Sequence, residues 1–328
     1  MGETVGLIVN PAAGRDIRRL TGGASVVDNY AKRRVAECVL EGLTSVPDPP
    51  TALVMPDTAR IAASAAEEVP DAETALLDLA IEGSAADTRR AAARFREEAD
   101  AIVVLGGDGT SRDTALECGE VPLVSVSTGT NNVVPTAVDG TVAGAAAALV
   151  ATGAVEEQDV TYRHGMVEAH TASGETVTGL ASVELSNRSF IGTRATLDPA
   201  DLAGGIVSRA NPADIGLSSV AGAIASLAPD DSGAIGLRLV DPDLAPRTGR
   251  AIVAPGVVAG VGIEDQRHLA EGESMTVDVE EGVVGADGER ELELVDELVE
   301  FRSAERGPRL VSVATLFEAA AGTGVFED

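Results

Sequence analysis

Five short apolar runs recur over the first part of the chain, at residues 5–9, 52–55, 75–79, 101–105 and 123–126. The stretches between them carry helical periodicity. In SAADTRRAAARFREEA, for example, alanines and Phe95 fall on one face, charges fall on the other, and Ser84 is available as a helix cap. Short buried strands that alternate with helices are typical of a parallel sheet covered on both faces. The sequence therefore predicts an α/β N-terminal domain built on a doubly wound parallel sheet.

The pattern changes near residue 161, where alternating runs such as IGLRLV, RAIVAP and SMTVDVE are separated by glycine and aspartate. A period of two predicts strands, so we expect a β-rich domain here, with one helix at DIGLSSVAGAIASLA. The expected division is an α/β nucleotide-binding domain over 1–155, a β-rich substrate domain over 156–305 and a tail over 306–328. This tail is expected to form a last strand and a short helix that pack back on the first domain. Because no low-complexity linker intervenes, we expect the domains to share an interface and a cleft.

Acidic residues dominate the charge of the chain. Its 328 residues include 53 Asp and Glu against 24 Lys and Arg, which gives a formal net charge of -29, and Lys32 is the only lysine. Such a surface repels nucleic acids and anionic membranes, so neither is an expected partner. Abundant acidic residues, a single lysine and 2% aromatic residues together resemble a haloarchaeal cytosolic protein. We therefore expect a halophilic, cytoplasmic protein that needs salt to screen its self-repulsion.

Cysteine usage and apolar segments agree with that compartment. Cys38 and Cys118 lie far apart without metal-ligand spacing, which predicts buried or idle thiols in a reducing cytosol. The N-terminus MGETVGLIVN lacks the basic region of a signal peptide. The alanine-rich run at 142–155 is too short to span a bilayer and predicts a packed helix.

The apolar run at 101–105 ends in GGDGT, a loop with three glycines and one carboxylate. In open parallel sheets, ligands bind beyond the carboxyl ends of the strands, which is where Gly106 and Gly107 begin. Glycines let backbone amides converge on an anion, and the helix predicted from SRDTALEC adds positive potential at its start, so phosphate fits this corner. Asp108 suits such a site if Mg²⁺ lies between it and the phosphate, or if it accepts a proton from an attacking hydroxyl. The alternative is a turn in which Asp108 only caps the helix.

A second polar turn, STGTNN at 127–132, leaves the next strand at the same edge. Its hydroxyls and amides can bind phosphate or ribose, although an asparagine-rich turn is the alternative. Arg112 follows the glycines and could contact a phosphate or face solvent. Lys32 and its neighbours Arg33 and Arg34 could offset triphosphate charge or lie on the surface. A Walker A loop is excluded, because the only lysine lies in NYAKRR with no glycine before it.

Several motifs resemble one enzyme superfamily. GGDGT at 106–110 resembles the signature of the NAD kinase, diacylglycerol kinase and phosphofructokinase-like superfamily, and NPAAG at 10–14 is similar to its first-strand turn. GGASVVDNYAKRR at 22–34 and VPLVSVSTGTNNVVP at 121–135 look most like the ATP-NAD kinase group named after the acetoin-catabolism protein X. ADGERELEL matches the C-terminal Asp-Gly element of the superfamily, although a hairpin turn at Asp-Gly also explains it.

This resemblance implies Mg²⁺-dependent transfer of the γ-phosphoryl group of ATP, or of polyphosphate, to a hydroxyl. In NAD kinases that hydroxyl is the 2′-OH of the adenosine ribose of NAD, and the product is NADP. The resemblance also implies a nucleotide in the cleft between the two domains and a homo-oligomer formed through the second domain. Asp108 takes the position of the catalytic carboxylate, as base or as metal ligand. The implied nucleotide- or phosphate-binding residues are Asn10, Gly14, Gly106, Gly107, Gly109, Thr110, Arg112, Thr128, Gly129, Thr130, Asn131 and Asn132, and the implied substrate-binding residues are Glu184, Asp287 and Glu289.

Two departures from the NAD kinase pattern leave the acceptor open. An Asn-Glu pair is expected in the second domain, but ASVELSN has Val183 before Glu184, and no Thr-Gly-Ser-Thr-Ala-Tyr stretch occurs between residues 198 and 228. The first hypothesis is an ATP-dependent NAD kinase, and the second is a kinase of another small hydroxyl compound, such as a sugar, a diol or a lipid headgroup. The third is a nucleotide-binding regulator without turnover. The intact Asp108 favours the enzymes, and the three histidines, which form no cluster, are assigned no chemistry.

Overall fold

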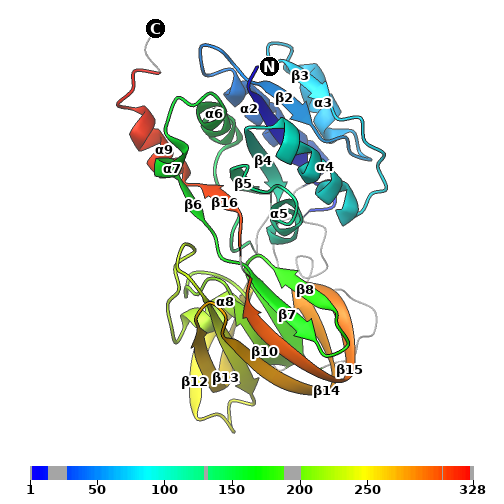
Figure 1. Cartoon of the computed structure of the whole chain (residues 1–328), viewed down its shortest axis with the longest axis vertical. Helices are drawn as coiled ribbons and strands as arrows, with labels where there is room; N and C mark the ends of the chain where they lie inside the picture. Colours follow the sequence, from blue (N-terminus) through cyan, green and yellow to red (C-terminus); the bar gives the residue numbers. More distant parts are fainter. Residues whose placement is uncertain (1, 14–27, 129–131, 188–200, 305, 326–328) are drawn as a thin grey trace.

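The structure is a computed structural model that describes residues 2–13, 28–128, 132–187, 201–304 and 306–325. Two layered units lie one above the other along the long axis (Figure 1). Helices and a largely parallel sheet form one unit, and long antiparallel strands form the other. The expected class, an α/β part followed by a β-rich part, is confirmed. Within the described residues, no helix has both the length and the apolar character needed to cross a membrane.

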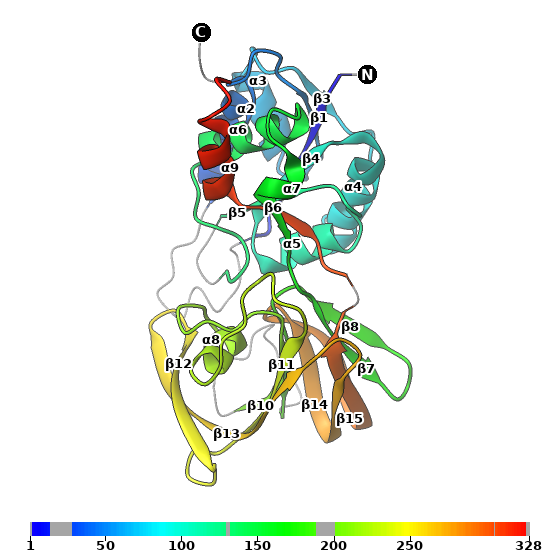
Figure 2. The ribbon, with the colours of Figure 1, turned by 60° about the vertical axis from the view of Figure 1, so that its left-hand side comes forward.

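Seven strands form the first sheet, in the order β3-β2-β1-β4-β5-β16-β6. They are β1 (Thr4–Val9), β2 (Thr51–Val54), β3 (Thr74–Leu76), β4 (Ala101–Gly106), β5 (Leu123–Ser127), β6 (Thr161–Arg163) and β16 (Arg309–Val311). β1 to β5 are parallel, and β16 runs parallel to β5 and antiparallel to β6 (Figure 2). Because β1, β4 and β5 are neighbours, the turns that follow them meet at one edge of the sheet.

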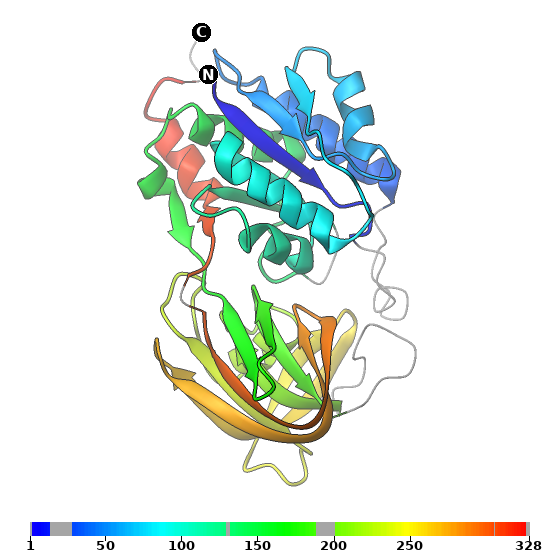
Figure 3. The same cartoon turned by 45° about the vertical axis from the view of Figure 1, so that its right-hand side comes forward.

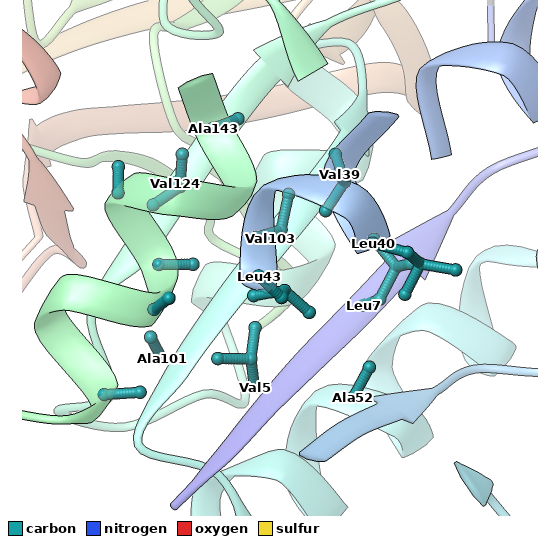
Figure 4. Packing of buried hydrophobic residues seen from close by; sticks show 14 of the residues in the cluster. Val5, Leu7, Val39, Leu40, Leu43, Ala52, Ala101, Val103, Val124 and Ala143 are labelled. Atoms are coloured by element: carbon teal, nitrogen blue, oxygen red, sulfur yellow. The ribbon is translucent and has the colours of Figure 1, made fainter. Parts of the chain in front are cut away.

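Helices cover both faces of this sheet (Figure 3). They are α2 (Asn29–Leu43), α3 (Ile61–Glu68), α4 (Ala85–Glu98), α5 (Asp108–Ala115), α6 (Gly140–Ala151), α7 (Glu157–Val160) and α9 (Val313–Ala320). Along β1, Val5 and Leu7 belong to the cluster that contains α2, α3 and α6 (Figure 4), whereas Ile8 belongs to the cluster that contains α4. This period of two places the central strands between two apolar layers, as a doubly wound sheet requires.

Two glycines set the distance between α2 and α6. A Cβ atom on Gly42 would lie 2.1 Å from the carbonyl oxygen of Thr141, and a Cβ atom on Gly144 would lie 2.0 Å from that of Val39. No side chain fits at either position, so the two helix backbones are in direct contact. The alanine-rich sequence of α6 is buried over most of its length, which confirms the packed helix expected at 142–155.

Nine antiparallel strands form the second sheet, in the order β12-β13-β11-β10-β9-β14-β15-β7-β8. They are β7 (Val167–Thr171), β8 (Thr176–Gly179), β9 (Ser182–Ser186), β10 (Leu202–Val207), β11 (Ala234–Val240), β12 (Arg247–Ala254), β13 (Val257–Leu269), β14 (Ser274–Ala286) and β15 (Glu289–Ser303). Along β10, Ile206 and Val207 belong to different apolar clusters, one on each face of the sheet. The second cluster contains α8 (Leu217–Gly222), which is shorter than the helix predicted at DIGLSSVAGAIASLA.

The two crossings between the sheets lie side by side. The amide of His164 donates to the carbonyl of Pro308 (3.0 Å), and the amide of Ala304 donates to the carbonyl of Met166 (2.8 Å). The pairing of β6 with β16 ties residues 161–163 to the first sheet, beyond the boundary expected at residue 155. The division into domains remains a proposal, in which the first boundary moves from residue 155 to beyond residue 163.

Candidate active site

Hydrogen bonds join the turns that follow β1 and β4. The amide of Asn10 donates to the carbonyl of Leu105 (3.2 Å), and Asn10 Nδ2 donates to the hydroxyl of Thr110 (2.9 Å). Parallel pairing of the two strands brings these turns to the same edge of the sheet. NPAA and GGDGT, 100 residues apart at this hydrogen bond, thus form one continuous surface.

Lys32 holds the turn after β1, a role that the sequence analysis left undecided. Its side chain is fully buried, and Nζ donates to the carbonyls of Asn10 (3.1 Å) and Pro11 (2.7 Å). α2 presents it from the first helical turn, because the carboxylate of Asp28 caps the helix by accepting from the amide of Ala31 (2.8 Å). The sequence feature that could have pointed to this role is that Lys32 is the only lysine in the chain.

Each glycine of GGDGT lies against a polar side chain. A Cβ atom on Gly106 would lie 2.5 Å from Cβ of Thr110, and one on Gly107 would lie 2.9 Å from Oδ1 of Asn132. A Cβ atom on Gly109 would lie 3.2 Å from the carboxyl group of Glu289, which belongs to the second sheet. The glycines therefore allow close approach of polar groups from three segments.

Asp108 is the first residue of α5, and its carboxylate accepts hydrogen bonds from the chain that follows β5. Oδ2 accepts from the amide of Val133 (2.9 Å), and Oδ1 accepts from the amide of Val134 (2.8 Å). Burial and the charge of Asp287 raise the pKa of Asp108 to about 7, against the lowering effect of the two amides. Asp108 is only 6% exposed and does not line either cavity described below. It lies beneath the cleft, whereas the sequence analysis expected it at the mouth.

Asp287 brings a second carboxyl group to this interface from the turn between β14 and β15. Its backbone is left-handed, with φ of 51°, and its oxygens accept from the amides of Leu180 (2.8 Å), Ala181 (2.7 Å) and Ser182 (3.1 Å). Burial raises the pKa of Asp287, while Arg112 and the three amides lower it less. Two interacting carboxyl groups of this kind attract a proton or a divalent cation.

The carboxyl pair of Asp108 and Asp287 fits a Mg²⁺ ion that takes its other ligands from water and phosphate. Mg²⁺ in proteins is commonly held by one or two carboxylates together with substrate phosphates. No cluster of three or more His, Cys, Asp and Glu side chains suited to a metal occurs among the described residues. A cation at this pair would therefore depend on the substrate for part of its coordination shell.

Arg112 links α5 to the second sheet. Its Nη1 donates to the carbonyl of Ala286 (3.1 Å), and its Nη2 forms an ion pair with Glu291 (2.8 Å) and a longer one with Glu289 (3.7 Å). Burial lowers the pKa of Arg112, but the surrounding carboxylates, Asp287 foremost, outweigh it and hold the pKa above its ordinary value. Arg112 is 3% exposed, so the sequence-based alternative of a solvent-facing side chain is wrong.

A cavity of about 640 Å³ lies beside the start of α5; we call it the large cavity. The turns after β1 and β2, the segment before α4, the start of α5 and the beginning of β15 all contribute to its wall. Five of the expected site residues line it, namely Asn10, Gly109, Thr110, Arg112 and Glu289. The sequence analysis missed the contribution of the second strand, where Asp57 and Thr58 follow the expected run at 52–55 in the same way that GGDGT follows the fourth.

The turn after β5 adds hydroxyl and amide groups below this edge. The amide of Thr128 donates to the carbonyl of Gly106 (3.0 Å), and Asn132 Nδ2 donates to the hydroxyl of Ser127 (2.6 Å). The hydroxyl of Thr128 is buried and has no hydrogen-bond partner. Such an unsatisfied group is costly unless a ligand or water completes it. Four further expected site residues, Gly14, Gly129, Thr130 and Asn131, lie outside the described residues.

A second cavity, of about 80 Å³, lies in the second sheet; we call it the small cavity. Its lining includes Glu184 and Ser186 on β9, Gly288 in the β14–β15 turn, and Glu289 and Arg290 at the start of β15. The hydroxyl of Ser182 donates to Glu184. Because Glu289 and Arg290 also line the large cavity, the two cavities meet at the start of β15. Asp287 lies immediately beside this junction in the sequence.

Comparisons with known proteins match both halves of the chain. Residues 5–155 match the family described as ATP-NAD kinase N-terminal domain, and residues 165–306 match the Acetoin catabolism protein X C-terminal domain. Acetoin catabolism protein X of Cupriavidus necator is 32% identical over 306 residues, which cover 89% of this chain and 85% of that protein. The chain belongs to the acetoin catabolism protein X family.

One solved structure shares the fold of this member of the acetoin catabolism protein X family. Yeast NADH kinase complexed with NADH superimposes with a TM-score of 0.51 at 11% identity, over 94% of this chain and 83% of that one. An NAD kinase from Archaeoglobus fulgidus in complex with ATP is also similar, with a TM-score of 0.40 at 12% identity over 85% and 99%. The fold class and the family expected from the sequence are thereby confirmed.

Proposed function

We propose that this protein is a phosphotransferase that moves the γ-phosphoryl group of ATP to a hydroxyl of a small molecule. The observation that carries the proposal is the large cavity, which borders the start of α5 on the first domain and residues 289–291 on the second. A cavity between two domains, at the carboxyl ends of parallel strands, is where this kind of fold binds ligands. Its volume suits a nucleotide.

The lining of the large cavity supports ATP over inorganic polyphosphate as donor. Met55 and Ile81 supply apolar surface, which suits a nucleobase and has no use for a chain of phosphates. At the other side, the start of α5 and the hydroxyl of Thr110 offer hydrogen-bond donors and a positive dipole end to phosphates. The unpartnered hydroxyl of Thr128 suits the same phosphate corner.

Asp108 and Asp287 are proposed to act at the point where the phosphoryl group is transferred from the donor to the acceptor. Mg²⁺ held by this carboxyl pair would neutralise charge that develops on the phosphates. With a pKa of about 7, Asp108 is present in both protonation states near neutral pH. Its ionised form can accept a proton, and because Asp108 lines neither cavity, the proton of the acceptor hydroxyl would reach it through water. Base and metal ligand are both proposed roles.

The acceptor is proposed to be either the 2′-hydroxyl of NAD, which would give NADP, or a hydroxyl of a smaller metabolite. The likeness in fold to NADH kinase supports the first. One observation favours the second: Val183, which takes the place of the asparagine in the Asn-Glu pair, is fully buried in the core of the second sheet. That position therefore has no surface with which to hold a dinucleotide.

A coupled assay tests these alternatives. The protein is incubated in molar KCl with Mg²⁺ and ATP, and ADP and NADP are measured with NAD or with a panel of small hydroxyl compounds as acceptor. ADP formation that depends on an acceptor supports the phosphotransferase, and the identity of that acceptor distinguishes the two candidates. If ATP binds but is never consumed with any acceptor, the kinase proposal fails and a nucleotide-binding regulator remains.

A further inference from the structure

The small cavity has a size that restricts what it can hold. Its volume is about 80 Å³. Since one water-sized group occupies roughly 10–15 Å³ on this measure, the cavity accommodates on the order of five to eight such groups. The adenosine part of a dinucleotide, with its purine and ribose rings, has more than twice as many such groups as the small cavity accommodates. A compound of about three to five carbons fits.

The wall of the small cavity combines apolar surface with an unsatisfied polar group. Leu202, Leu217 and Val253 form part of the wall, and the carboxyl group of Glu184 lies beside Gly285, where a Cβ atom would lie 3.3 Å from Oε2. Ser186 is 5% exposed, and its hydroxyl has no hydrogen-bond partner. A buried hydroxyl without a partner is costly, so a ligand that bonds to it would gain affinity.

The position of the small cavity makes it a neighbour of the proposed phosphoryl donor. Glu289 and Arg290 line both cavities, so a molecule in the small cavity lies next to a nucleotide in the large one. An anionic acceptor would meet the carboxylates of Glu184 and Glu289 there, and the single guanidinium of Arg290 offsets only one of these two charges. An uncharged compound, whose hydroxyl groups can bond to Ser186 and Glu184, avoids that repulsion.

We propose that the small cavity binds the phosphoryl acceptor, and that this acceptor is an uncharged compound of about three to five carbons with two or more hydroxyl groups. Ser186 is the residue that selects it. The inference rests on the proposed function. In the reaction, the acceptor oxygen bonds to the γ-phosphorus of ATP, the bond from that phosphorus to the bridging oxygen of ADP breaks, and ADP leaves with the electron pair. The hydroxyl proton passes through water at the junction of the cavities to the carboxylate of Asp108, which lines neither cavity itself.

The test measures phosphorylated product by ³¹P NMR with ATP, Mg²⁺ and one acceptor at a time: glycerol, 1,2-propanediol, erythritol or NAD. We expect product with at least one of the small compounds and none with NAD. Ser186→Ala should raise KM for the small acceptor by about three- to tenfold, as loss of one hydrogen bond predicts, and leave kcat and KM for ATP within twofold. Ser218→Ala is the matched control, because Ser218 has an equally buried and unpartnered hydroxyl but does not line the small cavity.

A variant that fills the small cavity gives an independent test of its role. Val253→Phe should abolish transfer to the small acceptor while ATP, measured by calorimetry, still binds within threefold of its wild-type affinity. Phosphorylation of NAD alone would overturn this inference and keep the proposed function. Transfer to a small acceptor with an unchanged KM in Ser186→Ala would overturn the assignment of the cavity. ATP consumption with none of the compounds would overturn the acceptor class, and failure to bind ATP at all would overturn the proposed function itself.

Discussion

Asp108 and Asp287 come from different domains, and their carboxyl groups interact at the interface between them. Asp108 is buried and Asp287 is half-buried, and both carboxyl groups are held in place by hydrogen bonds from backbone amides. Burial opposes charge on each, and the charge of Asp287 makes ionisation of Asp108 harder still. Two acids held in this way are set to bind one proton or one cation.

Replacing Asp108 by asparagine should remove this capacity with little change in shape. We expect Asp108→Asn to keep its far-UV circular dichroism spectrum and to lower kcat for ADP formation by about 10²–10⁴-fold, as loss of a general base or metal contact does. Asp278→Asn, on β14 in the second sheet, serves as the control for a neutralised carboxylate elsewhere. Turnover of Asp108→Asn within tenfold of the wild type would contradict the assignment.

The raised pKa of Asp108 also predicts how stability depends on pH. The folded protein binds the proton of this group more tightly than the unfolded chain does, since the pKa is about 7 against 3.8. The associated stabilisation is complete below pH 3.8 and is lost as the pH rises through 7. Asp108→Asn does not titrate, so the melting temperature of the variant minus that of the wild type should increase from pH 5 to pH 8. Thermal melts at constant KCl concentration measure this, and a constant difference would count against it.

The sequence analysis predicted Asp108, Asp287 and Glu289 as site residues, but it could not show that they lie close together. GGDGT marks the end of a strand by its local pattern, and this part of the site was therefore accessible to prediction. The environment of Asp108 depends on Asp287 and on the amides of Val133 and Val134, which only the tertiary fold brings together. For the same reason the ion pairs of Arg112 with residues of β15 were not foreseen.

At the scale of elements, the five apolar runs became β1 to β5 with small shifts in their ends. β4, for instance, spans Ala101–Gly106 where 101–105 was expected. The helices on both faces follow from the alternation of strand and helix patterns, whereas the order of the strands was not predicted. The alternation did not predict which helices pack in direct contact. The direct contact of α2 with α6 depends on Gly42 and Gly144, and a glycine in a helical pattern does not reveal which helix it will face.

Gly144→Ala tests that contact. Alanine favours a helix by up to about 1 kcal/mol over glycine, but its Cβ would lie 2.0 Å from the carbonyl oxygen of Val39 and force the helices apart. We expect a net loss of about 1–3 kcal/mol in the free energy of unfolding, measured by urea titration. Gly260→Ala is the control, since nothing lies within 4 Å of its Cβ position. A more stable Gly144→Ala protein would show that the helices can separate at no cost.

At the scale of the whole molecule, the net charge predicts how folding depends on salt. A net charge of -29 on 328 residues repels itself wherever solvent does not screen it. The Debye length falls from about 10 Å at 0.1 M to about 3 Å at 1 M ionic strength, so salt weakens this repulsion strongly.

The melting temperature should therefore rise between 0.1 M and 2 M KCl. Thermal unfolding monitored by far-UV circular dichroism measures this. A non-ionic solute at the same osmolality controls for effects of water activity and should give a smaller rise. Equal stability with and without molar KCl would mean that the acidic surface is not what limits this fold.

β6 and β16 pair with each other, so the chain departs from the first sheet and rejoins it through adjoining strands. The β-rich part is thus an insertion with its entry and exit in one place, so its exchange in evolution would not break the first sheet. The two halves of this chain match two differently described families, which is the pattern such an exchange leaves behind. Under the proposed function, exchange of this insert would change the acceptor and leave the nucleotide-binding edge of the first sheet unaltered.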